Sequence, residues 1–269
     1  MNNRRTRELA KGLLPPLLLQ GLLRLGLGGN RFKYGFKTWD QALSQCDGYD
    51  STKITEALIA ASRKVRDGKS AYERGGVVFD AIQHSWQLLA AILGTPRKGD
   101  VLRVLDWGGS LGSTYRQNKE LVEAAGINLS WVIVEQAHIF EIGKAEFQTD
   151  KLKFAPDLNR FQAGEFDLVI LASSICYVKE PEVILEKIRS LKPSGIAIDR
   201  TPITKSGAGQ IGVQRVGGKI YKSSYPIRSF ATAELEGFLG SEYKKVSEWI
   251  CELQPDPRTV SKGFFFISS

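Results

Sequence analysis

Cysteine and histidine are scarce in this chain of 269 residues, which holds three cysteines and two histidines. Cys46, Cys176 and Cys251 lie far apart and form no CxxC pair, so the sequence predicts neither a disulfide framework nor a zinc site. This usage is typical of a reducing compartment, and we expect a cytoplasmic protein. With only His84 and His138 a histidine-rich metal site is excluded, and no metal is expected.

A long uninterrupted apolar segment is also missing. The most apolar stretch, residues 13–29, is broken by Pro15, Pro16 and Arg24, which disfavours a transmembrane helix. Residues 1–37 carry +7 of the net charge of +8, so the rest of the chain lacks the broad basic surface that nucleic acids need. For residues 1–29 two interpretations stay open: a segment lying on an anionic membrane surface, on the inner face, or a terminal helix packed on the protein itself.

Short apolar runs alternate with helical patterns from residue 101 onward. Strands are expected at 101–107, 131–135, 166–173, 195–200, 244–253 and 261–268, and helices at 111–125, 138–148, 181–191 and 230–239. Runs that are apolar on both faces indicate a parallel sheet covered by helices. The fold class predicted is therefore α/β, a Rossmann-like doubly wound and mostly parallel sheet with an antiparallel last strand.

Three units are expected along the chain. Residues 1–37 form a basic apolar segment, residues 38–98 an N-terminal helical cap with helices at 51–67 and 77–94, and residues 99–269 the ligand-binding domain. Within that domain, residues 201–229 are rich in glycine and lysine and include a hairpin-like VGGKIY at 216–221. We expect these residues to form a mobile lid that meets an acidic or phosphorylated molecule.

The stretch LDWGGSLG, residues 105–112, joins a strand to a helix through a glycine turn, which is the geometry of a ligand site. The glycine spacing does not match the G-x-G-x-x-G of nicotinamide enzymes. Asp106 would repel a pyrophosphate and suits a cationic ligand, such as the amino acid end and sulfonium of S-adenosylmethionine (SAM). Glu135 ends the second strand, where a carboxylate can accept both ribose hydroxyls.

Residues 101–200 resemble a class I SAM-dependent methyltransferase through DWGGSLG, VEQ and FDLVILASSICYVKEPEVILEKI. More narrowly, residues 32–267 resemble a bacterial family of methyltransferases associated with surface-polysaccharide gene sets. The features that carry this resemblance are FKTWDQAL, GYDS, YERGGVVFD, IQHSWQLL, LDWGGSLGSTYRQN, VEQAH and IDRTP. One departure is Ser110, which stands where the usual D-x-G-x-G-x-G has its middle glycine.

The resemblance implies SAM as cofactor, S-adenosylhomocysteine (SAH) as product, and O-methylation of a sugar in a surface polysaccharide or its lipid-linked or nucleotide-linked precursor. The cofactor-binding residues expected are Asp106, Gly108, Gly109, Ser110, Gly112, Glu135, Gln136, Ala172 and Ser173. Three alternatives stay open. They are a SAM-binding regulatory or assembly protein without activity, a methyltransferase acting on a small molecule or a lipid, and a nicotinamide oxidoreductase.

A hydroxyl acceptor also needs a proton acceptor within hydrogen-bond reach. Asp199, expected at the end of the fifth strand, is the first candidate, and an ion pair with Arg200 is its structural alternative. His84 is the second candidate because its ordinary pKa suits the role, with Asp80 expected four residues earlier on the same helix face. Tyr177 could contact the acceptor or the methionine part of SAM.

Further acceptor contacts are expected from the cap and the lid. Tyr72, Glu73 and Arg74 precede a Gly-Gly turn and could close over the ligand, with a solvated loop as the alternative. The substrate-binding residues predicted are Tyr72, Arg74, Asp80, Arg200 and Lys219.

Overall fold

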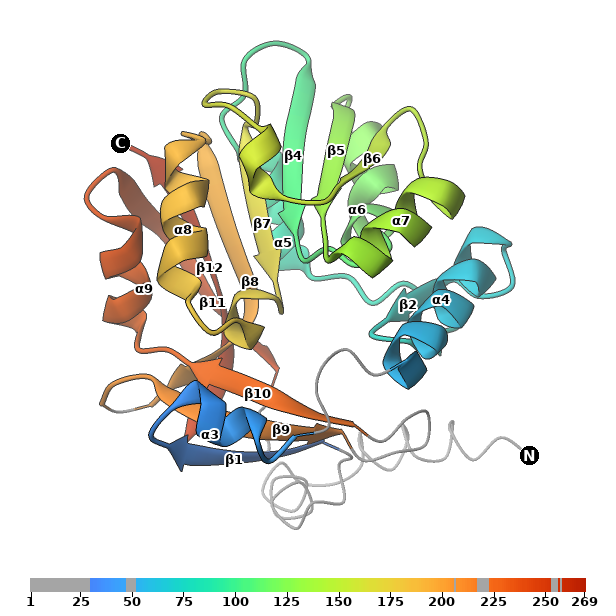
Figure 1. The fold of residues 1–269 in the computed structure, drawn as a ribbon. Helices are drawn as coiled ribbons and strands as arrows, with labels where there is room; N and C mark the ends of the chain where they lie inside the picture. Colours follow the sequence, from blue (N-terminus) through green and yellow to red (C-terminus); the bar gives the residue numbers. More distant parts are fainter. Residues whose placement is uncertain (1–29, 47–51, 206, 217–222, 253–255, 257) are drawn as a thin grey trace, which may run out of the picture.

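The computed structural model describes residues 30–46, 52–205, 207–216, 223–252, 256 and 258–269. Its main sheet has seven strands in the order β11-β12-β8-β7-β4-β5-β6 (Figure 1). The five strands β4 (Val101–Trp107), β5 (Asn128–Val134), β6 (Leu152–Ala155), β7 (Leu168–Ala172) and β8 (Gly195–Thr204) run parallel. If these five strands are numbered 1 to 5 along the chain, their order across the sheet is 3-2-1-4-5, as in a Rossmann-like fold. The order reverses between β4 and β7.

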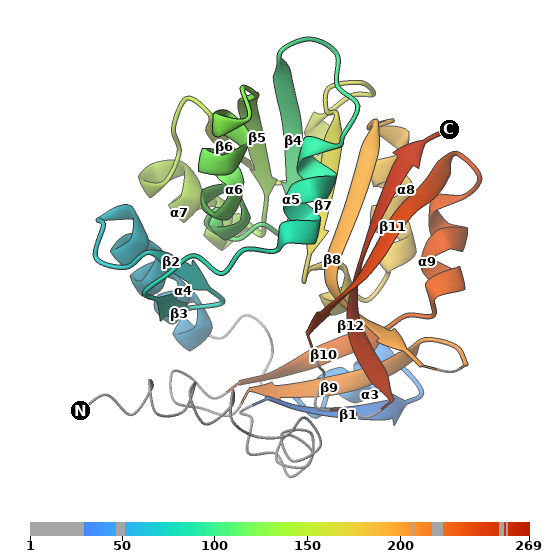
Figure 2. The same ribbon diagram turned by 180° about the vertical axis from the view of Figure 1, so that it is seen from behind.

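The last strand, β12 (Thr259–Ser268), pairs antiparallel with β8 and with β11 (Tyr243–Glu252). This topology confirms the predicted mostly parallel α/β sheet with an antiparallel last strand. One face is covered by α5 (Trp86–Leu93), α6 (Ser113–Ala124) and α7 (Ala137–Glu146), and the other by α8 (Pro181–Ser190) and α9 (Thr232–Leu239) (Figures 1 and 2). None of the described helices is long and apolar enough to cross a membrane.

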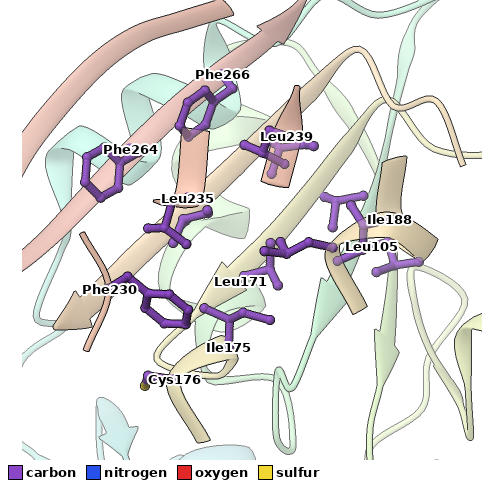
Figure 3. Packing of buried hydrophobic residues seen from close by; sticks show 14 of the residues in the cluster. Leu105, Leu171, Ile175, Cys176, Ile188, Phe230, Leu235, Leu239, Phe264 and Phe266 are labelled. Atoms are coloured by element: carbon purple, nitrogen blue, oxygen red, sulfur yellow. The ribbon is translucent and has the colours of Figure 1, made fainter. Parts of the chain in front are cut away.

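Apolar side chains fill both faces of the main sheet, because alternate residues of each central strand point to opposite sides. Leu105 and Leu171 face α8 and α9, where Phe230, Phe264 and Phe266 complete the cluster drawn in Figure 3. Each such side chain contributes about 1.5–3 kcal/mol on full burial. The sheet is therefore a rigid base that fixes the strand ends at which the polar residues gather.

In the cap, the second predicted helix is only partly helical. Helix α4 (Thr52–Arg66) matches the expected helix at 51–67, but the helix expected at 77–94 begins only at Trp86. Its first part is β3 (Val77–Phe79), paired antiparallel with β2 (Tyr72–Arg74). Gly75 and Gly76 both have positive φ, which makes the two-residue turn of a tight hairpin.

Much of the segment predicted as a lid, residues 201–229, belongs to a second sheet. The strands β9 (Gln210–Val216) and β10 (Ser223–Ser229) form an antiparallel hairpin, and β1 (Asn30–Phe36) pairs with β9 on the other side. The short helix α3 (Trp39–Leu43) contacts this sheet. Residues 30–36 thus join the insertion rather than a separate N-terminal segment, because their backbone groups pair with β9. Residues 1–29 and, apart from Val216, the hairpin-like stretch predicted at 216–221 lie outside the described residues.

Candidate functional site

The carboxyl ends of the parallel strands form a cavity of about 500 Å³. It lies where the strand order reverses, which is where open α/β sheets bind ligands. Its walls come from the ends of β4, β5 and β7, from the segment after β6, and from α8. The lining residues are Trp107, Gly108, Val134, Glu135, Gln136, Pro156, Asp157, Leu158, Asn159, Ser173, Ser174, Tyr177, Val178, Val183, Ile184 and Lys187.

Asp106 is a fully buried carboxylate directly beneath the glycine loop. The indole nitrogen of Trp131 donates to its Oδ2 at 3.3 Å, while its Oδ1 has no hydrogen-bond partner. A Cβ on Gly109 would lie 2.5 Å from the Asp106 Cγ, so only a glycine backbone covers the carboxylate there. Burial raises the pKa of Asp106 to about 7, and the nearby Glu135 adds to this rise.

Glu135 follows β5 and faces the glycine loop. Its carboxylate accepts from the backbone N–H of Ser110 at 2.9 Å and from that of Gln136, also at 2.9 Å. Burial raises its pKa, although these two hydrogen bonds oppose the rise. The predicted residues Asp106, Gly108, Gly109, Ser110 and Glu135 therefore do come together around one loop. Gly112, with positive φ, caps the start of α6. Ala172 is the last residue of β7, and Gln136 directly precedes α7.

Backbone strain is concentrated at this edge of the sheet. Four non-glycine residues in the described part of the chain have positive φ: Ser110, Ser173, Lys192 and Arg200. Ser110, Ser173 and Arg200 lie at the glycine loop, after β7 and in the outer part of β8, all on the carboxyl side. Such conformations cost about 1–3 kcal/mol each and persist where surrounding contacts hold them, often at ligand sites.

Asp199 lies level with Ala172, the last residue of β7, and so at the expected carboxyl edge, but its side chain is fully buried. Strand β8 continues past it to Thr204 and still pairs with β12 there. Its Oδ2 pairs with the Arg200 guanidinium at 2.6 Å, and its Oδ1 accepts from the Trp249 indole at 2.9 Å and the Cys251 thiol at 3.2 Å. With both oxygens engaged, Asp199 holds Arg200 rather than facing an acceptor, which corrects its assignment as the first candidate for the base.

His84 precedes α5 instead of lying within a helix. Its ring stacks on Trp86 with the centroids 4.7 Å apart, and its Nδ1 is buried without a partner. Asp80 is exposed in the segment after β3, so the expected helix face shared by Asp80 and His84 does not exist. The segment between β3 and α5 crosses the carboxyl edge of the main sheet (Figure 2). His84 thus has an unused ring nitrogen, and it is not among the residues that line the cavity.

The hairpin β2–β3 packs over the start of α6. Glu73 is 1% exposed, accepts a hydrogen bond from the Ser113 hydroxyl, and has a second oxygen with no partner. Arg116 folds back over its own helix and donates to the Leu111 carbonyl at 2.7 Å. Burial lowers the pKa of Arg116, and the charge of Glu73 opposes this fall. The cap therefore contributes a buried acid to the glycine loop.

The remaining predicted residues are placed as follows. Tyr177 lines the cavity and donates from its hydroxyl to Gln214 at 3.0 Å. Tyr72 is buried in β2 and packs on Phe79, and Arg74 ends the same strand. Lys219 lies outside the described residues.

Several residues of the site were missed by the sequence analysis. Trp107 and Asp157 line the cavity, and Trp131 contacts Asp106. Glu73, which was expected near the ligand with Tyr72 and Arg74, contacts the start of α6. Asp157 has no sequence signal, because β6 was not predicted and the residues after it were not recognised as a strand end.

The comparisons with known proteins agree with the fold. No protein-family model and no curated protein matches the chain. Among solved structures, the 4+2 cyclase SpnF matches with a TM-score of 0.50 at 11% identity, over 80% of this chain and 93% of that one. These values show a shared fold and nothing further.

Two other matches have TM-scores of 0.45. One is the N-terminal domain of EvdMO1, in the presence of SAH and D-fucose, at 15% identity over 81% of this chain and 100% of that one. The other is the 1,6-didemethyltoxoflavin-N1-methyltransferase of Burkholderia thailandensis with bound SAH, at 14% identity over 88% and 99%. Fold and site together define a Rossmann-like α/β protein with an acidic glycine loop at its ligand cavity.

Proposed function

We propose that this protein is a SAM-dependent methyltransferase that holds its donor across the carboxyl ends of β4, β5 and β7. The observation that supports this most is the unpartnered Asp106 Oδ1 under Gly109. A buried carboxylate costs free energy unless a cation or a hydrogen-bond donor compensates it. Its charge acts on a cationic ligand through a buried water molecule or across the glycine backbone.

The other parts of SAM also fit residues of the site. Each carboxylate oxygen accepts two hydrogen bonds, so Glu135 can accept the ribose hydroxyls while keeping Ser110 and Gln136. The apolar walls at Leu158, Val178 and Ile184 suit an adenine ring, and a cavity of about 500 Å³ lies in the range of small-molecule sites. The hydroxyls of Ser110 and Ser174 are buried without partners beside the same loop.

The mechanism assigned to these residues is mainly one of positioning. SAM supplies an electrophilic methyl group on a cationic sulfur. The glycine loop, Asp106 and Glu135 fix the orientation of the donor, and the hairpin β2–β3 covers the loop and excludes water. Orientation of this kind supplies roughly 7–11 kcal/mol in well-oriented systems.

A hydroxyl acceptor loses its proton to a nearby base, and we assign this role to His84 in place of Asp199. Its Nδ1 is buried and unpartnered, and its ring is held by Trp86. His84→Gln is expected to lower kcat by about 10²–10⁴-fold and to leave SAH binding unchanged. Measurement of SAH release with each acceptor tested would show this, and an equal loss of SAH affinity would contradict it.

For the acceptor we propose a sugar hydroxyl of a surface polysaccharide or of its lipid-linked or nucleotide-linked precursor. The sequence resemblance supports this choice. The 61% exposed Trp86 beside His84 also supports it, since a flat aromatic face can pack against the C–H face of a sugar ring.

Calorimetric titration with SAH, with NADH as control, tests the donor site. Saturable SAH binding that is weakened in Asp106→Asn supports the proposal, and binding of NADH alone contradicts it. The match to a protein described as a cyclase keeps a second candidate, a SAM-binding protein without methyl transfer. Binding of SAH without SAH release from SAM in the presence of any acceptor would favour that candidate.

A further inference from the structure

The positions around the glycine loop that would attract an anionic group are already taken by the protein's own carboxylates. The Ser110 N–H donates to Glu135, and the hydroxyl of Ser113, the first residue of α6, donates to the buried Glu73. The start of a helix normally offers its free N–H groups and its dipole to an anion. Here Asp106, Glu135 and Glu73 surround it with negative charge instead.

This arrangement poses a problem for the amino acid end of SAM, which carries an ammonium and a carboxylate on the same carbon. The three acids attract the ammonium and repel the carboxylate. The carboxylate therefore needs a cation nearby. Arg116 lies beside the loop, but its guanidinium donates to the Leu111 carbonyl and interacts with the buried Glu73.

Arg200 is a cation fixed at the same edge of the sheet. Its NH1 donates to Asp199 at 2.6 Å and its Nε to the Ser173 hydroxyl at 3.1 Å. Its backbone N–H donates to the Cys251 sulfur at 3.4 Å, and its φ of 51° turns the chain at this point. The Arg200 side chain is 15% exposed, so it is fixed by these hydrogen bonds and still accessible to a ligand.

Arg200 and Asp106 lie on β8 and β4, with β7 between them, which separates the two strands by about 10 Å. Asp106 is level with Ala197, so Arg200 is also three residues further toward the carboxyl end, on the side where the ligand would lie. A long arginine side chain spans much of that separation. Electrostatics agrees, because the charge of Arg200 partly opposes the rise in the pKa of Asp106.

We propose that Arg200 binds the α-carboxylate of SAM while Asp106 attracts its α-ammonium, and this inference rests on the function proposed above. A guanidinium can bridge two carboxylates, here those of Asp199 and of the ligand. Asp199, Trp249 and Cys251 are then positioning residues that hold Arg200 in its strained conformation.

Decarboxylated SAM tests this directly, because it keeps the adenosine, the sulfonium and the amine and lacks only the carboxylate. Calorimetry would compare SAM and decarboxylated SAM on the wild-type protein and on Arg200→Met. We expect Arg200→Met to weaken SAM by about 10- to 100-fold and to leave decarboxylated SAM within about twofold of wild type. Arg200→Lys, which keeps the charge but not the fork, is expected to fall between the two.

Arg189→Met is the matched control, since Arg189 forms an exposed ion pair with Glu242 away from the site. It is expected to bind both ligands as the wild type does, and near-UV circular dichroism would check that each variant is folded. Equal weakening of both ligands by Arg200→Met, or no weakening of either, would overturn the role of Arg200 while leaving the proposed function intact. Failure of the wild type to bind SAM would overturn both.

Discussion

Asp106 gives the donor site a pH dependence whose direction follows from its pKa of about 7. The α-ammonium of SAH binds best to the ionised carboxylate, so SAH affinity is expected to rise between pH 6 and 8. In the unliganded protein, the pKa of Asp106 is higher in the folded state than in the unfolded state, so the folded state binds the proton more tightly. The contribution of Asp106 to the free energy of unfolding therefore falls as pH rises from about 4 toward 7. Asp106→Asn should bind SAH more weakly at pH 8 and without this dependence, as calorimetry at several pH values would show. A wild-type affinity that falls over this range would contradict the assignment.

Gly109 tests how closely the loop covers that carboxylate. Gly109→Ala would place a Cβ 2.5 Å from the Asp106 side chain, and we expect a loss of about 1–3 kcal/mol in the free energy of unfolding together with weaker SAH binding. Gly237→Ala is the control, because Gly237 lies inside α9 with open space around it. That change should stabilise the protein by about 0.5–1 kcal/mol in a urea unfolding experiment. Equal effects of the two changes would show that the close approach at Gly109 has no consequence.

Single residues were predictable where a local pattern carries their chemistry. Asp106 lies near the end of one apolar strand and Glu135 directly follows the next, so their approach to the glycine loop was predictable from sequence order. The burial of Asp199 was not predicted, because β8 continues past it in its pairing with β12, which no local pattern reveals. Trp131 and Trp249 were missed because their hydrogen bonds to buried carboxylates come from neighbouring strands.

At the scale of elements, the contact between the hairpin β2–β3 and α6 depends on one buried hydrogen bond. Ser113→Ala removes the donor to Glu73 and leaves that carboxylate without a partner, so we expect a loss of about 1–3 kcal/mol and faster amide exchange in the hairpin. By contrast, Glu146→Gln breaks exposed ion pairs between α4 and α7 and should cost less than about 1 kcal/mol. Hydrogen exchange with mass spectrometry separates the two cases. Unchanged exchange in residues 72–79 of Ser113→Ala would contradict this account.

Elements with strong periodicity were predicted well and the short ones poorly. The strand β4 and the helices α6, α7 and α8 lie within two residues of their expected bounds. The segment at residues 77–79 was assigned to a helix because it precedes a truly helical run, while the Gly75–Gly76 turn in fact directs it into a hairpin. The hairpin-like stretch at 216–221 was recognised between β9 and β10, but the bounds of these polar strands were not. Strand β1 was missed because it pairs with β9 over a long sequence separation.

At the scale of the whole molecule, the uneven distribution of charge indicates which segment would bind an anionic membrane. Residues 1–37 hold eight of the basic residues and a single acid. If residues 1–29 bind an anionic surface, the full chain should sediment with phosphatidylserine-containing vesicles at low salt and be released by high salt. A variant beginning at Asn30, which retains all of β1, should stay in the supernatant. Equal sedimentation of the two would favour the self-packed interpretation of residues 1–29.

The position of β12 has a consequence for how the chain acquires its structure. This strand follows β11 in the sequence yet separates it from β8 in the sheet. Until β12 has been made, β11 has nothing to pair with, and Trp249 cannot reach Asp199. The half of the sheet that holds Arg200 is therefore expected to close late, after the β4–β5–β6 half, because its pairing waits for contacts between distant parts of the sequence. The strands β4 and β5, which position Asp106 and Glu135, would then fold before the part of β8 that holds Arg200.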